Sequence, residues 1–337
     1  APGMYRDLHS YVSALESAGE LVRVSARVSP INEIGAIADR VSKTRAPNPP
    51  SASAKRTDPA FHHLGGPALL FEDVEGCDTP VLINAFGSYR RMEMALGRSL
   101  EAIADQIGSL VKPEPPRSLR EAIEKGRSLL PLLRIGPKRV RGRGACQEVV
   151  ETGDRVDLTR LGMIRCWDHD GDFAALGYPA GVNEGIEGLG RPGMSVEDWE
   201  ASQRGRYITL AGIHTIHADD RNEAKPKSHN IGMYRVQLLG RDRLAMHWHM
   251  HHDGAAHWRS WKKLGEPMPV AIVLGGPSVL AYSATCPLPP GISELLMAGF
   301  LNGSGIRMAR GVSVPLWVPA DAEIVIEGHV RTDAGYP

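Results

Sequence analysis

The 337-residue sequence has no excess of charge of one sign, because 39 Lys and Arg residues balance 39 Asp and Glu residues. This balance gives no support for binding to nucleic acid or to an anionic membrane. No run approaches the ~20 apolar residues that a membrane-spanning helix needs. The N-terminus also lacks a basic segment followed by an apolar run, so a secretory signal peptide is not indicated and we expect a cytoplasmic protein.

Cysteine is scarce and scattered. The four residues Cys77, Cys146, Cys166 and Cys286 form no CxxC pair. Their spacing argues against a disulfide framework and against a cysteine-rich zinc site, and it favours a reducing compartment. The length is sufficient for two or three domains with sizeable cores.

The N-terminal third alternates between helical and strand patterns. Apolar residues at helical spacing predict a helix over 5–18, and Gly19 follows it as a stop signal. A Pro- and Ser-rich stretch at 45–60 is typical of a mobile loop. Further patterns predict short strands and a second helix, at 21–24, 68–71, 81–85 and 98–111. We therefore expect an N-terminal α/β domain over residues 4–112.

After a Pro- and Arg-rich connector the pattern becomes that of β-structure. Strand candidates with turn residues between them occur at 207–216, 233–239, 243–251, 270–274 and 322–326. They predict a second domain over residues 113–330. Residues 176–206 are Gly-rich without a strong period, and the sequence leaves open whether they form a functional lid or a disordered loop.

The last apolar run, at 323–330, also predicts a strand. A central strand so close to the end of the sequence suggests that the natural protein continues. Residues 331–337 would then be a truncated tail.

The stretch AMHWHMHHDG, residues 245–254, holds four of the thirteen histidines. In a strand, His247, His249 and His251 would share one face. Because they would spread over ~13 Å, at most two adjacent ones could reach one metal ion. The alternative, in which most of these histidines are hydrogen-bonded wall residues, stays open at this point.

Two neighbouring segments carry groups suited to an anion or a hard cation. In SHNIGMYR, Gly232 permits a close backbone approach, and Arg235 offers a fork of donors for a carboxylate or phosphate. Asn230 with a nearby carboxylate suits Mn²⁺ or Mg²⁺ better than zinc. In CPLPPGISE, Ser293 can cap a helix whose first turn holds Glu294. A tight turn before a strand and a dipole-stabilised carboxylate explain the same residues without a ligand.

Taken together these segments resemble the UbiD family of decarboxylases. The matching text comprises NIGMYR at 230–235, MHWHMHHDGA at 246–255, PMPVAIVLGG at 267–276, CPLPPGISE at 286–294 and VPADAEIVIEG at 318–328. GPALLFEDVEG at 66–76 and PVLINAFGSYRR at 80–91 also fit. The resemblance covers nearly the whole chain, in the family's order.

The resemblance implies an α+β fold, in which the N-terminal α/β domain precedes a split β-barrel of the flavin-reductase type and the family's C-terminal α/β domain is absent. It implies prenylated FMN with Mn²⁺ and K⁺. The metal ligands carry over to Asn230, His251 and Glu294, with His252 as second choice for the histidine. Four further positions would line the cofactor, namely Ile231, Met233, Tyr234 and Met250. The K⁺ site would lie near Ser283, Ala284, Cys286 and Glu294.

The implied activity is reversible, non-oxidative decarboxylation of an aromatic, heteroaromatic or α,β-unsaturated acid. Arg235, the family's active-site arginine, would orient the substrate carboxylate, and a flavin prenyltransferase would supply the cofactor. The family's catalytic acids normally follow the 323–330 strand and are missing, so we expect the chain by itself to lack turnover. A homo-oligomer is possible. The alternatives are a split-barrel flavin oxidoreductase, a non-catalytic flavin-binding module and a zinc hydrolase.

Overall fold

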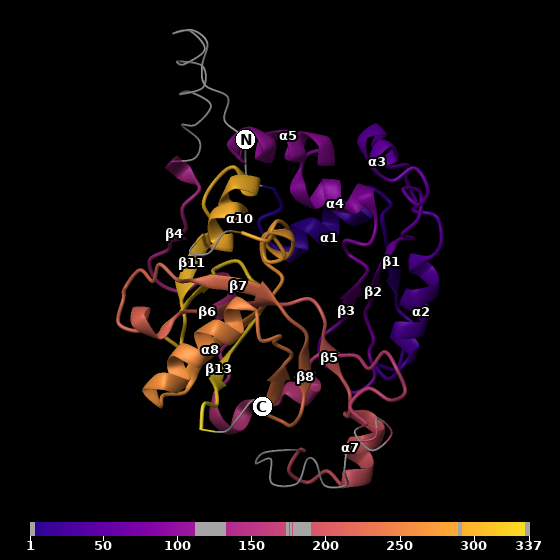
Figure 1. The fold of residues 1–337 in the computed structure, drawn as a ribbon. Helices are drawn as coiled ribbons and strands as arrows, with labels where there is room; N and C mark the ends of the chain where they lie inside the picture. The colour runs from indigo at the N-terminus through magenta and orange to yellow at the C-terminus, as the bar shows by residue number, and fades with distance from the viewer. Residues whose placement is uncertain are drawn as a thin grey trace, which may run out of the picture.

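The computed structural model describes residues 4–111, 133–172, 175, 177, 190–288 and 292–333. Helices and strands are mixed along the chain, and the strands form four small sheets (Figure 1). No helix in these ranges is long and apolar enough to cross a membrane. The mixed α+β class predicted from the sequence is confirmed.

The N-terminal third forms a three-stranded sheet covered by helices. The sheet has the order β1-β2-β3, with β1 parallel to β2 and β3 antiparallel to it. Its strands are β1 (Leu21–Val24), β2 (Ala68–Phe71) and β3 (Val81–Ile83). The helices are α1 (Leu8–Ser17), α2 (Glu33–Ser42), α3 (Ala52–Thr57), α4 (Tyr89–Leu96) and α5 (Leu100–Val111).

Helix α1 confirms the helix predicted over residues 5–18 and shows what stabilises it. Asp7 accepts a hydrogen bond from the backbone N–H of Ser10 at 2.8 Å and so caps the helix. The apolar face buries Tyr11 and Leu15 against the sheet. The Tyr11 hydroxyl donates to the carbonyls of Ala85 and Arg91, which ties α1 to the segments after β3.

The rest of the chain supplies three further sheets. The largest has the order β13-β10-β6-β7, and the others are β5-β8-β9 and β12-β11-β4. Their strands are β4 (Lys138–Arg139), β5 (Tyr207–Ile208), β6 (Gly212–Thr215), β7 (Asn230–Met233), β8 (Val236–Leu238), β9 (Leu244–Met246), β10 (Met268–Leu274), β11 (Arg307–Arg310), β12 (Trp317–Pro319) and β13 (Ile324–Val330). The helices among them are α7 (Val196–Ser202), α8 (Asp253–Leu264), α9 (Leu280–Ser283) and α10 (Glu294–Asn302).

Two of these sheets enclose one apolar core. Ile213 of β6, Val236 of β8 and Ile272 of β10 are buried together in it. On the β13-β10-β6-β7 sheet, Trp258 and Trp261 of α8 pack into a separate cluster with β10. The two packed sheets agree with the mixed fold, whereas a closed barrel is not seen in the described ranges and the split-barrel detail stays a prediction.

Several expected elements are wrong in detail. The stretch 45–60 contains α3 instead of a loop throughout, because Ser51 caps that helix by accepting from the Ala54 N–H. The expected strand at 207–216 divides between two sheets as β5 and β6. The final strand, β13, is confirmed, but it lies at an edge of the described sheet and is not central. Residues 190–206 of the Gly-rich segment include α7, and most of 176–189 lies outside the described residues.

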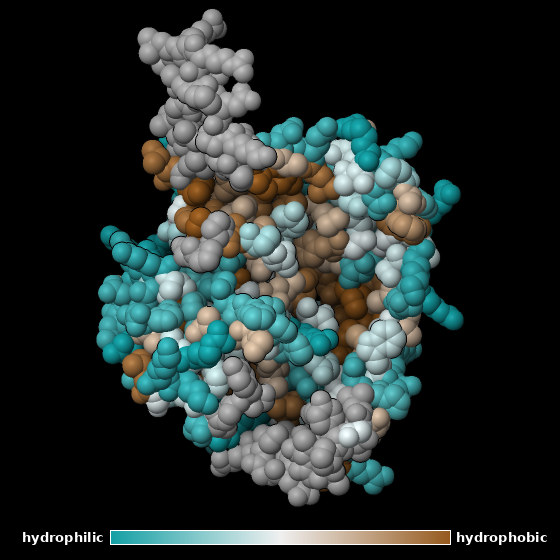
Figure 2. Space-filling view, viewed as in Figure 1, coloured by the Kyte–Doolittle hydropathy of each residue, from teal (hydrophilic) through white to brown (hydrophobic). Residues whose placement is uncertain are grey.

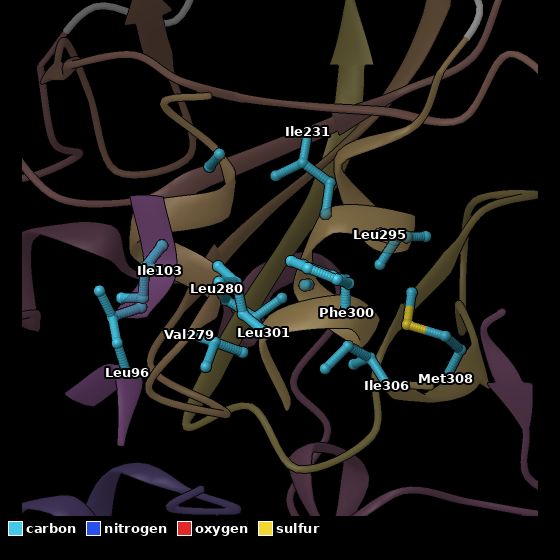
Figure 3. Close-up of a cluster of buried hydrophobic side chains, with 12 residues drawn as sticks. Leu96, Ile103, Ile231, Val279, Leu280, Leu295, Phe300, Leu301, Ile306 and Met308 are labelled. Carbon is cyan, nitrogen blue, oxygen red and sulfur yellow. The ribbon is translucent and has the colours of Figure 1, made fainter. Parts of the chain in front are cut away.

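Helix α10 is anchored beside β7. Ser293 accepts from the Leu295 N–H at 3.2 Å, which confirms its predicted capping role. Leu295 and Phe300 belong to a buried cluster that also contains Ile231 of β7 (Figure 3). This packing fixes the first turn of α10 against the start of β7.

Candidate metal and cofactor site

Three segments that are distant in sequence place polar side chains together at the start of β7. The amide nitrogen of Asn230 lies 3.1 and 3.2 Å from the two carboxylate oxygens of Glu294. The Ile231 backbone N–H donates to Glu294 at 2.8 Å. Asp253, the first residue of α8, accepts from Asn230 at 3.4 Å. The structure therefore brings Asn230 and Glu294 together, as predicted, and adds Asp253.

The Asn230 carboxamide is the most informative group in this cluster. Its oxygen Oδ1 is buried and has no hydrogen-bond partner, although buried polar atoms nearly always have one. Which end of the amide is oxygen is an assignment that follows the hydrogen-bond network. In either orientation the cluster holds carboxylate and amide oxygens, which are the donors that Mn²⁺ and Mg²⁺ prefer. The residues thus fit a hard divalent cation.

The electrostatics of Glu294 also favour binding of a cation. Burial raises the pKa of this carboxyl, the Ile231 N–H opposes the rise, and the Asp253 carboxylate adds to it. Two carboxylates on one amide, with no cationic side chain beside them among the described residues, are mutually repulsive when ionised. A bound cation would relieve that repulsion, and the cluster should therefore bind metal more strongly as the pH rises.

The histidine stretch does not continue β9 as a strand, so the alternating-face argument made from the sequence was wrong. The strand ends at Met246 and residues 250–252 form a turn that leads into α8. His251 is exposed on this turn, with its ring 5.2 Å from that of His249. Position 254 needs glycine, because a Cβ there would lie 2.9 Å from the Trp248 indole nitrogen. Met250 is also exposed, at 57%.

His252 occupies a more enclosed position than His251. It is the residue directly before α8, and its Nδ1 accepts from the His249 backbone N–H at 2.9 Å. Its ring lies 5.0 Å from that of Tyr234. Burial, followed by the neighbouring His249, lowers the pKa of His252, which favours the neutral imidazole that a metal requires.

Among the described residues, no three His, Cys, Asp or Glu side chains lie close enough to hold one ion. A zinc site built from the four histidines of residues 245–254 therefore has no support in this arrangement. A metal at this place would need the oxygen of Asn230 as one of its ligands.

The remaining residues of the NIGMYR segment line different surroundings. Gly232 is required because a Cβ there would lie 2.2 Å from the Tyr234 ring. Burial raises the pKa of Tyr234 to about 12, so its hydroxyl stays protonated. Arg235 is exposed and lies between β7 and β8. Burial raises the pKa of the Tyr207 phenol, and the positive charge of Arg235 partly opposes that rise.

The segment expected to hold K⁺ lies within electrostatic reach of Glu294. Burial raises the pKa of the Cys286 thiol, and Glu294 contributes to the rise. Ser283 is fully buried and donates to the Val279 carbonyl at 2.8 Å. Residues 289–291, which complete the expected CPLPPG turn, lie outside the described residues.

A cavity of about 570 Å³ adjoins the same strand. Ile231 and Met233 of β7 line it, opposite Val12 of α1 and Leu82 of β3. Its walls are mostly apolar, and the molecule is hollowed and brown between the N-terminal layer and the β5 and β7 strands (Figure 2). The volume lies in the range of small-molecule and cofactor sites, which often form between domains.

Sequence reasoning missed a buried histidine pair next to this site. His214 Nδ1 and His229 Nε2 lie 2.8 Å apart, and both rings are buried. Burial lowers the pKa of His229 to about 4, so the pair is neutral near pH 7. The two positions are isolated in sequence, and only the pairing of β6 with β7 brings them together.

Comparisons with known proteins agree with this geometry. Residues 12–111 match the 3-octaprenyl-4-hydroxybenzoate carboxy-lyase N-terminal domain, and residues 194–335 match the Rift-related domain of the same family. An uncharacterized protein of Aquifex aeolicus (strain VF5) is 36% identical over 327 residues, which cover 97% of this chain and 55% of that protein.

Solved structures show the same fold. The vanillic acid decarboxylase of Sedimentibacter hydroxybenzoicus in closed form superimposes with a TM-score of 0.66 at 22% identity, over 97% of this chain and 55% of that one. An evolved dimeric form of the UbiD-class enzyme HmfF from Pelotomaculum thermopropionicum, in complex with prFMN, superimposes with a TM-score of 0.64 at 20% identity, over 97% of this chain and 58% of that one. The chain spans about half the length of the relatives it matches. With both domain models matched in order, the chain belongs to the UbiD family.

Proposed function

We propose that the chain forms the cofactor-binding part of a non-oxidative, reversible decarboxylase that acts on an aromatic, heteroaromatic or α,β-unsaturated acid. The activity is proposed for a protein that also carries the remaining length of its relatives. The convergence of Asn230 and Glu294, with the unpartnered Asn230 oxygen, is the observation that carries the proposal. The family membership and the solved UbiD-class complex with prFMN support it.

The proposed cofactors are prenylated FMN, Mn²⁺ and K⁺, with a flavin prenyltransferase as supplier. Asn230, Glu294 and one histidine of the 251–252 pair would hold Mn²⁺, which in turn neutralises the cofactor phosphate. His252 suits this role better than His251, because it is less exposed and directly precedes Asp253, whose carboxylate accepts from Asn230. When bound, the flavin supplies the electron sink that carbon–carboxylate cleavage needs and that side chains do not offer.

The chain's own residues would bind and orient the substrate. Arg235, exposed beside the 247–252 turn, would hold the substrate carboxylate through paired N–H donors. The His247 N–H donates to the Arg235 carbonyl at 3.1 Å, which holds the turn next to the arginine backbone. The apolar cavity beside Ile231 and Met233 would exclude water from the site. A homo-oligomer is proposed as the assembly.

The test is Mn²⁺ binding, followed by the loss of the free-ion electron paramagnetic resonance signal. Asn230→Ala and Glu294→Gln should each weaken binding at least about tenfold, because each removes a ligand oxygen or its charge. Asn302→Ala, at the opposite end of α10, is the matched control and should bind as the parent does. Equal binding by all three variants would refute the metal site.

The histidine assignment has its own comparison. His252→Ala should weaken Mn²⁺ binding, and His251→Ala should leave it nearly unchanged. The reverse result would restore the register deduced from the sequence. Retention of prenylated FMN, read from absorbance and mass after co-production with a flavin prenyltransferase, should follow the same order. Zinc in place of manganese, with no flavin retained, would favour the hydrolase alternative.

A further inference from the structure

A second, smaller cavity of about 200 Å³ lies where the β12-β11-β4 sheet meets the start of α10. Its floor is apolar and buried, since Leu295 is 2% and Met308 1% exposed. Two exposed cations, Arg139 and Lys227, also line it, together with the half-buried ring of Trp317. The cavity therefore combines an apolar interior with a positively charged rim.

The cations near this cavity differ in their pairing from Arg307, which lies in the same sheet. Arg307, on β11, pairs with Asp321 at 3.0 Å. Arg310 on the same strand has its guanidinium 5.7 Å from the Trp317 ring centre, and Arg139 lies 5.0 Å from it. Within the described part of the chain, neither these two arginines nor Lys227 has a carboxylate partner.

Trp317 is fixed in place and so gives the cations a defined geometry. Its indole N–H donates to the Ala224 carbonyl at 3.1 Å, and β12 pairs with β11 in register beside Arg310. A guanidinium held near an indole ring keeps its N–H donors available at its edge for an oxyanion. The rim is therefore organised for a negative group before any ligand arrives.

We infer that this cavity binds a small amphiphilic anion, a carboxylate or phosphate attached to an apolar group the size of one ring. Arg139 and Lys227 would bind the oxyanion, and Leu295 and Met308 would contact the apolar group. The volume lies below that of sites for drug-sized ligands, which limits the ligand to about one ring and its head group. His229 and Ser293 also line the cavity, so it lies beside Asn230 and Glu294 in the chain, but neither of those two residues lines it and the inference does not depend on the proposed function.

The experiment measures binding to the whole 337-residue chain by isothermal titration calorimetry. Benzoate and phenyl phosphate carry both parts of the ligand, whereas inorganic phosphate lacks the ring and benzyl alcohol lacks the charge. We expect saturable binding of at least one of the two amphiphilic anions at this cavity, tighter than for either partial probe, in addition to any binding of an aromatic acid at the proposed Arg235 site. Which of the two binds better identifies the head group.

Matched variants locate the binding. Arg139→Ala and Lys227→Ala should each weaken it about tenfold or more, as expected for a lost charged hydrogen bond. Arg141→Ala and Lys225→Ala remove a cation from the same two segments but do not line the cavity, so they should bind as the parent does. Any binding at the proposed substrate site should be lost in Arg235→Ala, whereas binding at this cavity should keep its affinity, which separates the two sites.

A filling variant provides a second line of proof. Leu296→Trp places a larger side chain at a partly exposed position of the cavity wall and should block binding, with an unchanged far-UV circular dichroism spectrum and melting temperature as evidence of folding. No saturable binding of either amphiphilic anion, or equal affinity in Arg139→Ala and Arg141→Ala, would overturn the inference. Loss of binding in Arg235→Ala alone would assign the ligand to the other site.

Discussion

Two buried polar clusters, one in the N-terminal layer and one at the start of β7, differ in how completely they are satisfied. In the first, Arg91 and Glu20 are both fully buried and lie 3.0 Å apart. The other guanidinium donors reach the carbonyls of Gly65, Gly66 and Asn84. Burial lowers the pKa of Arg91, and its pairing with Glu20 opposes that shift. Opposite charges and complete hydrogen bonding make this a structural cluster.

The β7 cluster has the opposite character. Glu294 and Asp253 carry the same charge, Asn230 is shared between them, and its oxygen has no partner. Burial raises the pKa of Glu294, and in the described part of the chain no cationic side chain opposes that rise. A buried cluster that lacks one positive charge is unfavourable by itself and favourable with a cation. The comparison distinguishes polar groups that stabilise the fold from polar groups suited to bind a ligand.

The largest predicted effect removes the structural cluster. Arg91→Met should destabilise the protein by about 3–5 kcal/mol, because it leaves the Glu20 carboxylate buried without its partner. The free energy of unfolding from urea titration gives the measurement. Arg90→Met, the exposed neighbour, is the control and should change it by less than about 0.5 kcal/mol. If the two variants proved equally stable, the contrast between the clusters would be lost.

The double variant Arg91→Met with Glu20→Gln sharpens the result. Because no charge is then left buried, it should recover part of the stability lost in Arg91→Met. A double variant less stable than the single one would show that the cost came from packing and not from the unpaired carboxylate.

The next effect concerns a buried histidine that has a partner. Burial, and secondarily His217, lowers the pKa of His257 to about 4, and its Nδ1 lies 2.9 Å from the Thr215 hydroxyl. Because the folded-state pKa lies below the unfolded value of about 6.5, this group stabilises the fold above pH 6.5. That contribution should be lost, by up to about 3 kcal/mol, as the pH falls from 6.5 to 4.

The measurement is urea unfolding at several pH values for the parent and His257→Gln. The variant should show a shallower loss of stability between pH 6.5 and 4, whatever its stability at pH 7. His217→Gln, in which the replaced histidine is more exposed, is the control and should keep most of the parent's slope. Parallel curves for the parent and His257→Gln would contradict the prediction.

The third substitution, Glu294→Gln, should leave stability unchanged or raise it, whereas Arg91→Met lowers it. Since the folded-state pKa of Glu294 is raised above its usual value near 4.5, folding favours the protonated form and stability is lost as the pH rises above 4.5. Without metal, Glu294→Gln should therefore be as stable as the parent or more stable by about 1 kcal/mol at pH 7. With Mn²⁺, only the parent should gain thermal stability. A metal-free variant that was strongly destabilised would make the β7 cluster structural.

How much could be predicted from the sequence depended on whether the signal was local. The cap at Ser293, and the apolar periods of α1 and β13, lie within a few residues and were predicted correctly, whereas the cap at Asp7 was not predicted. Asn230 and Glu294 were paired only through the family resemblance, because 63 intervening residues separate them and no period links them. The turn at 250–252 was missed, since alternation of histidines imitates a strand where α8 in fact begins at Asp253.

The smallest effect tests the second carboxylate of the β7 cluster. Asp253→Asn keeps the size of the side chain and removes one negative charge beside Asn230. Because Asp253 is exposed, the stability of the metal-free protein should change by less than about 0.5 kcal/mol. Its charge still contributes to the raised pKa of Glu294, so Mn²⁺ affinity measured by paramagnetic resonance should fall by a few-fold, less than in Glu294→Gln. Asp219→Asn, an exposed acid away from the cluster, should leave Mn²⁺ affinity unchanged. If Asp253→Asn instead abolished metal binding, Asp253 would be a direct ligand and the cluster would contain two coordinating carboxylates.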